Sequence, residues 1–181
     1  MHDTDLDNIE PAPFLVENVA LLPKGRVLDV AAGYGRNALY LAGLGFQVDG
    51  VDISAEAVRY AGKAARASGL SINLRTASLE DEFKIEKNGY DVIICFSYLQ
   101  RGLIPQIKAG LRRGGVVVYE TFLVDQALWG KPKNPDYLLK HNELLEMFRD
   151  FRCLRYREGV FINGQDRRAI AGIVAEKLQP G

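Results

Sequence analysis

Residues 27–37 read VLDVAAGYGRN, and this stretch decides the fold. Its first half is apolar apart from Asp29, which is typical of a buried parallel strand, and we predict that strand over Arg26 to Val30. Gly33 and Gly35 then form a turn that opens a helix. Small residues let a ligand approach the backbone closely, and the first N–H groups of a helix are free to bind it. The stretch therefore predicts a ligand-binding strand–turn–helix unit.

Working outward from this unit, strand-like and helix-like runs alternate, which is typical of parallel βαβ units. Further strands are predicted at residues 46–52, 72–76, 90–96 and 116–119, and helices are predicted to begin near Pro13, Ser54, Pro105 and Asn142, with Ser54 and Asn142 as N-caps. Two last β-like runs, 153–162 and 169–178, flank Asn163-Gly164, a type I′ hairpin signal. We predict an α/β fold with a doubly wound, mostly parallel seven-stranded sheet that ends in an antiparallel hairpin. Residues 1–181 are expected to form a single domain, with 1–12 flexible.

The composition narrows the function classes. Lys and Arg balance Asp and Glu at 23 each, so the basic excess of most nucleic-acid-binding proteins is missing. Cys95 and Cys153 form no CxxC pair and lie in apolar runs, so we expect buried thiols and no metal site. No apolar run approaches the ~20 residues of a membrane span. A cytoplasmic protein without nucleic-acid or membrane partners is expected. Six arginines between residues 149 and 168 are interpreted as a solvated sheet edge.

Two carboxylates flank the glycine turn. Asp52, at the end of the second predicted strand, is placed to accept both hydroxyls of an adenosine ribose. Gly33, Gly35 and Ala38 also satisfy the dinucleotide pattern G-x-G-x-x-A. Asp29 favours a different ligand, because a carboxylate repels a pyrophosphate but attracts the ammonium and sulfonium of S-adenosylmethionine. The alternative for Asp29 is a structural carboxylate that caps the loop amides.

The stretch 27–42 resembles motif I of the class I S-adenosylmethionine-dependent methyltransferases. Gly35-Arg36-Asn37 followed by ALYLA at 38–42 is similar to the tellurite-resistance methyltransferase family. Residues 111–115, LRRGG, resemble the L-[KR]-P-G-G turn of class I enzymes, with Arg113 where proline is usual. The resemblance extends over Leu22 to Leu178. It implies a Rossmann-like methyltransferase fold and S-adenosylmethionine-dependent methyl transfer to a small-molecule acceptor by in-line displacement.

The resemblance also implies roles for individual residues. Asp29 and the loop from Ala31 to Gly35 would hold the methionine portion, with Arg36 on its carboxylate. Alanine at 31 replaces the first glycine of the usual motif, a change that should be tolerated. The remaining cofactor-binding residues would be Asp52 for the ribose, Ile53, Ser78 and Leu79 around the adenine, and Phe96 at the end of the fourth strand. Ser78 stands where the family often has an acid.

Candidates for the acceptor side follow the fourth and fifth strands, because ligands bind at the carboxyl ends of such sheets. Glu120 is the candidate general base, and its alternative is a salt-bridged carboxylate. Tyr98 is a second catalytic candidate, and its alternative is a core aromatic residue. The long segment Asp125 to Lys140 is interpreted as a lid, in which Trp129 covers the acceptor and Lys131 attracts it. A base is optional, since positioning supplies much of the rate of an in-line displacement.

Two other function classes remain open at this point. One is an NAD-dependent oxidoreductase on a Rossmann domain, although the chain has no Tyr-x-x-x-Lys pair of short-chain dehydrogenases. The other is a non-catalytic nucleoside-binding module, since a fold does not imply a function. The acceptor atom and the oligomeric state stay undetermined.

Overall fold

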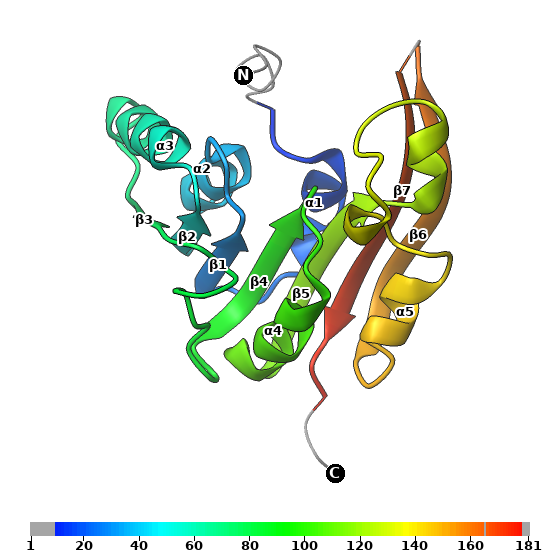
Figure 1. The fold of residues 1–181 in the computed structure, drawn as a ribbon. Helices are drawn as coiled ribbons and strands as arrows, with labels where there is room; N and C mark the ends of the chain where they lie inside the picture. Colours follow the sequence, from blue (N-terminus) through cyan, green and yellow to red (C-terminus); the bar gives the residue numbers. More distant parts are fainter. Residues whose placement is uncertain (1–9, 165, 179–181) are drawn as a thin grey trace.

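The computed structural model describes residues 10–164 and 166–178. Seven strands form one sheet in the order β3-β2-β1-β4-β5-β7-β6 (Figure 1). Their bounds are β1 Arg26–Val30, β2 Gln47–Asp52, β3 Ile72–Thr76, β4 Tyr90–Phe96, β5 Leu111–Phe122, β6 Arg152–Asn163 and β7 Asp166–Glu176. β1 to β5 run parallel, whereas β7 is antiparallel to both β5 and β6. The predicted fold class is confirmed, including the antiparallel hairpin.

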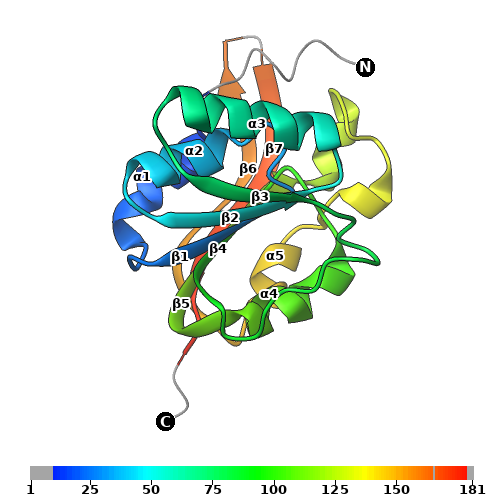
Figure 2. The same cartoon turned by 90° about the vertical axis from the view of Figure 1, so that its left-hand side faces the viewer.

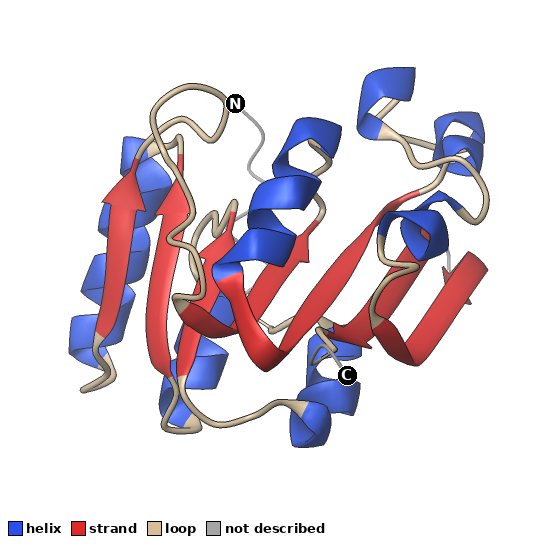
Figure 3. Cartoon of the chain, turned by 90° about the horizontal axis from the view of Figure 1, so that it is seen from below, coloured by secondary structure: helices blue, strands red, loops and turns tan. Residues whose placement is uncertain are grey.

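Helices cover both faces of the sheet, as Figure 2 shows, and Figure 3 shows the twisted sheet between them. α1 Pro13–Asn18, α2 Arg36–Gly43 and α3 Ala55–Ala67 lie on one face, and α4 Ile104–Gly110 and α5 Glu143–Met147 lie on the other. Short 3₁₀ turns are η1 Val19–Leu21, η2 Arg101–Leu103, η3 Val124–Leu128 and η4 Pro135–Tyr137. None of the helices within the described residues is long and apolar enough to cross a membrane.

The central strands are explained by their sequence. Residues 92–95 of β4 are fully buried between the two helical layers, which accounts for the continuous apolar run. The Ser54 hydroxyl accepts the N–H of Ala57 at 3.2 Å, so the predicted N-cap of α3 is confirmed. The connection from β3 to β4, residues 77–89, contains no helix and leaves part of one sheet face uncovered.

Three local predictions are corrected by the structure. Asn142 precedes α5 with φ +64° and no capping bond from its side chain; its N–H instead donates to the carboxylate of Glu158. Cys95 is buried as expected, but Cys153 is exposed on the edge strand β6. The fifth strand begins at Leu111, so the predicted turn residues lie inside it, and Gly114 supplies the positive φ of +75° that bends the chain there.

The structure describes only part of the predicted hairpin turn after β6 and of the segment 1–12 that was expected to be flexible. The strands flanking the hairpin are as expected, but residue 165 of the turn lies outside the described residues. Of the segment 1–12, residues 1–9 also lie outside them. Ala12 is buried, and its N–H donates to Asn37 Oδ1 at 2.8 Å. This bond fixes the start of α1 against α2, at the edge of the sheet where the parallel strands end.

Candidate active site

The carboxyl ends of the parallel strands meet at the upper edge of the sheet in Figure 1, and the turn after β1 lies there. Ala31, Gly33 and Gly35 in this turn all have positive φ, at 56°, 53° and 80°. A Cβ at position 35 would lie 2.6 Å from the Cβ of Ala61, so only glycine fits where α2 approaches α3. The turn therefore places the backbone N–H groups at the start of α2 beside the strand ends.

Asp52 joins this turn to the end of β2. Its Oδ2 accepts the N–H of Gly33 at 2.7 Å, and its Oδ1 accepts the N–H of Ser54 at 2.8 Å. Each carboxylate oxygen has a second lone pair, so both remain able to accept hydroxyl hydrogens of a ligand. The side chain is half-buried, with one side open to solvent.

Asp29 is the most perturbed acid of the site. It is buried, and its Oδ2 is the one buried side-chain oxygen or nitrogen without a hydrogen-bond partner in the described part of the chain. Burial, and next the negative charge of Asp52, raise the pKa of Asp29 to about 8, while Arg36 and the N–H of Ala38 act in the opposite direction. A buried, unsatisfied carboxylate is destabilising unless a donor or a cation satisfies it. The ammonium of S-adenosylmethionine is such a group, so the residues fit this cofactor.

The residues assigned to adenine lie after β2 and β3. Ile53 is 74% exposed, which is unusual for an isoleucine at a strand end and fits a platform for an apolar ring. Leu79 is buried. Ser78 belongs to a tight turn, because its Oγ accepts the N–H of Glu80 and its own N–H donates to Glu82. The structure thus brings Ile53 and Ser78 to the same edge of the sheet as Asp52.

A cavity of about 320 Å³ adjoins the glycine turn at the ends of β4 and β5. Arg36, Phe96 and Glu120 from the predicted set line it, together with Ser97. Ser97 has φ +56°, a left-handed conformation that is unfavourable for a residue with a side chain. Strained backbone of this kind gathers at functional sites, and here it follows directly on β4 as Ala31 follows on β1.

Glu120 forms an ion pair with Arg157 inside this cavity. Nε and Nη2 of Arg157 both donate to Oε2 of Glu120, at 2.9 and 2.7 Å. The guanidinium also lies 4.5 Å from the ring centroid of Phe14 and 5.0 Å from that of Phe161. Burial raises the pKa of Glu120, and Arg157 partly opposes this. The interpretation of the arginine cluster as a solvated edge is therefore wrong for Arg157, because this side chain lines the cavity.

Tyr98 lies apart from Glu120. Its hydroxyl donates to Oε1 of Gln100 at 2.9 Å, and its carbonyl accepts the hydroxyl of Tyr119 at 2.8 Å. The ring packs against the apolar cluster on the α4 and α5 face, whereas the cavity borders the α1 face. The structure does not bring the two catalytic candidates together.

The segment 125–140 is closed at its base by an isolated β-bridge between Leu123 and Leu139. Gln126 is buried inside it, where its Oε1 accepts the N–H of Ala169 at 2.9 Å. Trp129 and Lys131 lie further out and are exposed, and neither lines the cavity. Movement of the outer part of the segment is required before either residue contacts an acceptor.

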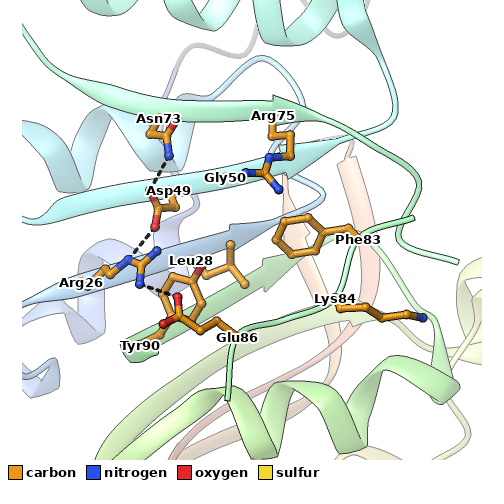
Figure 4. A pocket seen from close by; sticks show the side chains of 10 residues that line it. All are labelled: Arg26, Leu28, Asp49, Gly50, Asn73, Arg75, Phe83, Lys84, Glu86 and Tyr90. Atoms are coloured by element: carbon orange, nitrogen blue, oxygen red, sulfur yellow. Dashed lines mark hydrogen bonds and ion pairs between the residues drawn. The ribbon is translucent and has the colours of Figure 1, made fainter. Parts of the chain in front are cut away.

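A second cavity, of about 150 Å³, lies where the connection 77–89 leaves the sheet uncovered (Figure 4). Arg26 occupies its floor and binds Asp49 and Glu86, each at 2.7 Å, while Tyr90 packs beneath the guanidinium at 4.6 Å. None of the predicted site residues lines it. This ion-pair network joins the start of β1 to the middle of β2 and to the connection 77–89.

Ser97 follows the fourth strand, where the acceptor-side candidates were expected. Sequence reasoning missed two site residues, Arg157 and Phe161, because both lie on β6 and are brought in by long-range pairing. Within residues 10–164 and 166–178, no group of His, Cys, Asp and Glu side chains is arranged to hold a metal ion.

Comparison with known proteins agrees with this geometry. Residues 27–115 match a family model described as "Methyltransferase domain". The ubiquinone biosynthesis O-methyltransferase of Burkholderia vietnamiensis is 30% identical over 111 residues, which are 59% of this chain and 48% of that protein. The 23S rRNA (uracil(747)-C(5))-methyltransferase of Pyrococcus abyssi is 36% identical over 83 residues, which are 45% of this chain and 20% of that protein. The match spans about half the length of the first of these relatives and 20% of the second.

Solved structures share the fold at low sequence identity. TehB from Haemophilus influenzae superposes with a TM-score of 0.77 at 21% identity, over 90% of this chain and 61% of that one. A SAM-dependent methyltransferase from Methanosarcina mazei superposes with a TM-score of 0.73 at 19% identity, over 94% of this chain and all of that one. These likenesses establish the fold predicted from the motifs.

Proposed function

We propose that the chain methylates a small-molecule acceptor with S-adenosylmethionine, since residues 27–115 match a methyltransferase domain and the chain has the fold of class I S-adenosylmethionine-dependent methyltransferases. The observation that carries the proposal is Asp29, a buried carboxylate with an unpartnered oxygen beside the glycine turn. A cationic ligand satisfies that oxygen, whereas the pyrophosphate of a dinucleotide is repelled by it. The printed names of the relatives support the same chemistry.

Different residues of the site bind the methionine portion, the ribose and the adenine of the cofactor. Asp29, Ala31, Gly33 and Gly35 hold the methionine portion, and Arg36 binds its carboxylate. Asp52 accepts the ribose hydroxyls, and the adenine contacts Ile53, Ser78 and Leu79. Phe96, at the end of β4, contacts the cofactor on the side of the cavity. The cofactor supplies a methyl group made electrophilic by its bond to a positively charged sulfur.

The acceptor binds in the cavity lined by Phe96, Ser97 and Glu120, which adjoins the cofactor through Arg36. Walls that orient the acceptor and exclude water supply most of the rate in such a displacement. Glu120 removes a proton from the acceptor where one must leave. Tyr98 packs on the opposite face, where its hydroxyl donates to Gln100, so it takes no part in this proton transfer.

We infer further that residues 1–181 act as one domain, because the hairpin β6–β7 completes the same sheet and contributes Arg157 to the cavity. The balanced charge of the chain favours a small acceptor over a nucleic acid. A cytoplasmic location fits the exposed free thiol of Cys153, since exposed thiols persist in a reducing compartment.

Calorimetry tests the proposal directly. S-adenosylmethionine and S-adenosylhomocysteine are titrated into the full chain, and NADH is titrated in a parallel experiment. We expect both sulfur compounds to bind with a Kd in the range of about 1–100 μM and NADH to show no heat of binding. Binding of NADH without binding of S-adenosylmethionine contradicts the proposal and favours the oxidoreductase alternative.

A further inference from the structure

The charges that line the 320 Å³ cavity cancel one another. Three arginines and three acids contribute to its wall. Arg157 is committed to Glu120 at 2.7 Å, and Nε of Arg168 lies 2.8 Å from Asp166. The third arginine, Arg36, donates to the backbone oxygen of Glu10 at 3.3 Å and is the residue assigned above to the carboxylate of the cofactor. An anionic acceptor would meet as many carboxylates as guanidiniums, so the cavity offers no net attraction for it.

Apart from Ser97 and Thr121, the rest of the cavity wall is apolar, and it includes three aromatic rings. Phe96, Phe122 and Phe161 contribute from β4, β5 and β6. At the rim Phe161 and Ile162 are 38% and 65% exposed, although both stand on an edge strand where polar residues are usual. Aromatic side chains prefer other rings as neighbours, in edge-to-face or offset stacked contact. The volume is at the lower end for ligand sites, so it suits one ring with a small substituent.

Glu120 provides one polar feature on which such a ring could be oriented. Both hydrogen bonds from Arg157 reach the same oxygen, Oε2, so Arg157 does not engage Oε1. A carboxylate held in this way is oriented by one oxygen and free to accept a proton on the other. A phenol is much easier for a carboxylate to deprotonate than an aliphatic alcohol, since phenolic groups ionise near pH 10 and water only near 15.7.

We propose that the acceptor is a neutral, single-ring aromatic compound whose phenolic hydroxyl lies beside Glu120 while its ring packs among Phe96, Phe122 and Phe161. The inference rests on the proposed function. The phenolic oxygen forms a bond to the methyl carbon as the bond from that carbon to sulfur breaks. The electron pair of the broken bond remains on sulfur, which becomes a neutral thioether, and the phenolic proton passes to Oε1 of Glu120.

Binding of two related probes tests the substrate class without any turnover. Methyl 4-hydroxybenzoate and 4-hydroxybenzoate share a ring and a hydroxyl but differ by one negative charge. With S-adenosylhomocysteine present, calorimetry should show the neutral ester binding at least about tenfold more tightly than the acid, and sodium selenite not binding. Equal or tighter binding of the acid, binding of selenite alone, or no binding of the ester overturns the inference.

Turnover then tests the role of Glu120. Mass spectrometry should find the transferred methyl group on the phenolic oxygen of the ester. Glu120→Gln should lower kcat about 100-fold, the usual contribution of a general base, and change KM less than about threefold. The matched control is Glu176→Gln, which removes the partner of Arg152 at the far end of β7 and should leave both constants unchanged.

The pH profile separates a base from a structural ion pair. In the wild type, kcat should rise with pH as Glu120 loses its proton, and this rise should be missing in Glu120→Gln. An unchanged profile or an unchanged kcat overturns the role of Glu120.

Wild-type selectivity between the two probes needs no variant, so misfolding of a variant does not affect that test. If S-adenosylmethionine itself fails to bind, the proposed function fails; if it binds and the ester does not, only this inference fails.

Discussion

The N–H of Gly33 donates a 2.7 Å hydrogen bond to Oδ2 of Asp52, and this bond joins the turn after β1 to the end of β2. Asp52 therefore has a structural role in addition to the ligand role inferred for it. The carboxylate holds the turn in place, and the turn presents the N–H groups at the start of α2. A variant at this position should change both the stability of the turn and the affinity for the cofactor.

We expect Asp52→Ala to lower the free energy of unfolding by about 1–2 kcal/mol, because two backbone N–H groups lose their acceptor. The same variant should weaken S-adenosylmethionine binding by about 1.5–3 kcal/mol. Urea unfolding and calorimetry measure the two effects. Asp49→Ala is the matched control, since Asp49 lies in the middle of β2, where it accepts bonds from Arg26 and Asn73, and the variant should affect stability alone. An unchanged Kd in folded Asp52→Ala would contradict the ribose assignment.

Ala31 has φ +56°, so the substitution of alanine for the first glycine of the motif is tolerated at a conformational cost. Replacing it with glycine relieves this cost of about 1–2 kcal/mol and adds some entropy to the unfolded chain. Ala31→Gly should therefore raise the free energy of unfolding by about 0.5–1 kcal/mol. Ala32→Gly is the control and should lower it, because Ala32 has no positive φ to relieve. A destabilised Ala31→Gly would show that contacts of its methyl group outweigh the strain.

The sequence predicts those features of this fold that depend on neighbouring residues. β1 and β4 have the predicted bounds because each is a mostly apolar run next to a turn signal. Asp52 and the glycine turn were recognisable because their spacing reflects a single βαβ unit. Arg157 was not recognisable, because its contact with Glu120 spans 37 residues and depends on the order β5-β7-β6. A register shift of one residue would turn its side chain to the other face of the sheet.

The raised pKa of Asp29 predicts how the free energy of unfolding depends on pH. Burial raises its pKa to about 8, whereas an unfolded aspartate ionises near 3.9. Between these two pH values the folded protein holds a proton that the unfolded chain has lost. The contribution of Asp29 to stability therefore falls as pH rises through this window and becomes constant above about pH 8. We expect this fall, of about 1.4 kcal/mol per pH unit at most, in urea unfolding of the free protein.

The variant Asp29→Asn should show a flatter dependence of stability on pH between about pH 5 and about pH 8. Its affinity for S-adenosylmethionine should also be reduced, because the amide does not neutralise an ammonium. In the wild type this affinity should rise with pH through about 8, as Asp29 becomes charged. The same slope in wild type and variant would show that other groups cause the pH dependence.

Asp125 begins the segment 125–140 and His141 directly follows it, with Nε2 of His141 and Oδ2 of Asp125 2.5 Å apart. The hydrogen bond to Asp125 and its charge raise the pKa of His141. Protonated histidine stabilises the pair, so this contribution is full below pH 6.5 and is lost as pH rises through the higher pKa of the folded state. NMR titration of His141 should give a pKa above 6.5, and Asp125→Asn should return it toward that value. An unshifted titration in the wild type would mean that the pair does not form in solution.

Trp129 tests the lid interpretation of the same segment. The bridge between Leu123 and Leu139 fixes the base, so movement is confined to the outer part of the segment around Gly130. If this part closes over the cavity, Trp129 fluorescence and amide exchange nearby should change when S-adenosylhomocysteine and an acceptor are both bound, and less with either alone.

Trp129→Ala should then lower kcat/KM about tenfold while leaving cofactor affinity within a factor of about two, because a lid acts on the acceptor and on water. Leu128→Ala is the matched control, since Leu128 is also exposed in the segment and directly precedes the tryptophan. Slow exchange that ligands do not alter, together with normal turnover of Trp129→Ala, would make the segment a fixed part of the wall that supports β7 through Gln126 and Ala169.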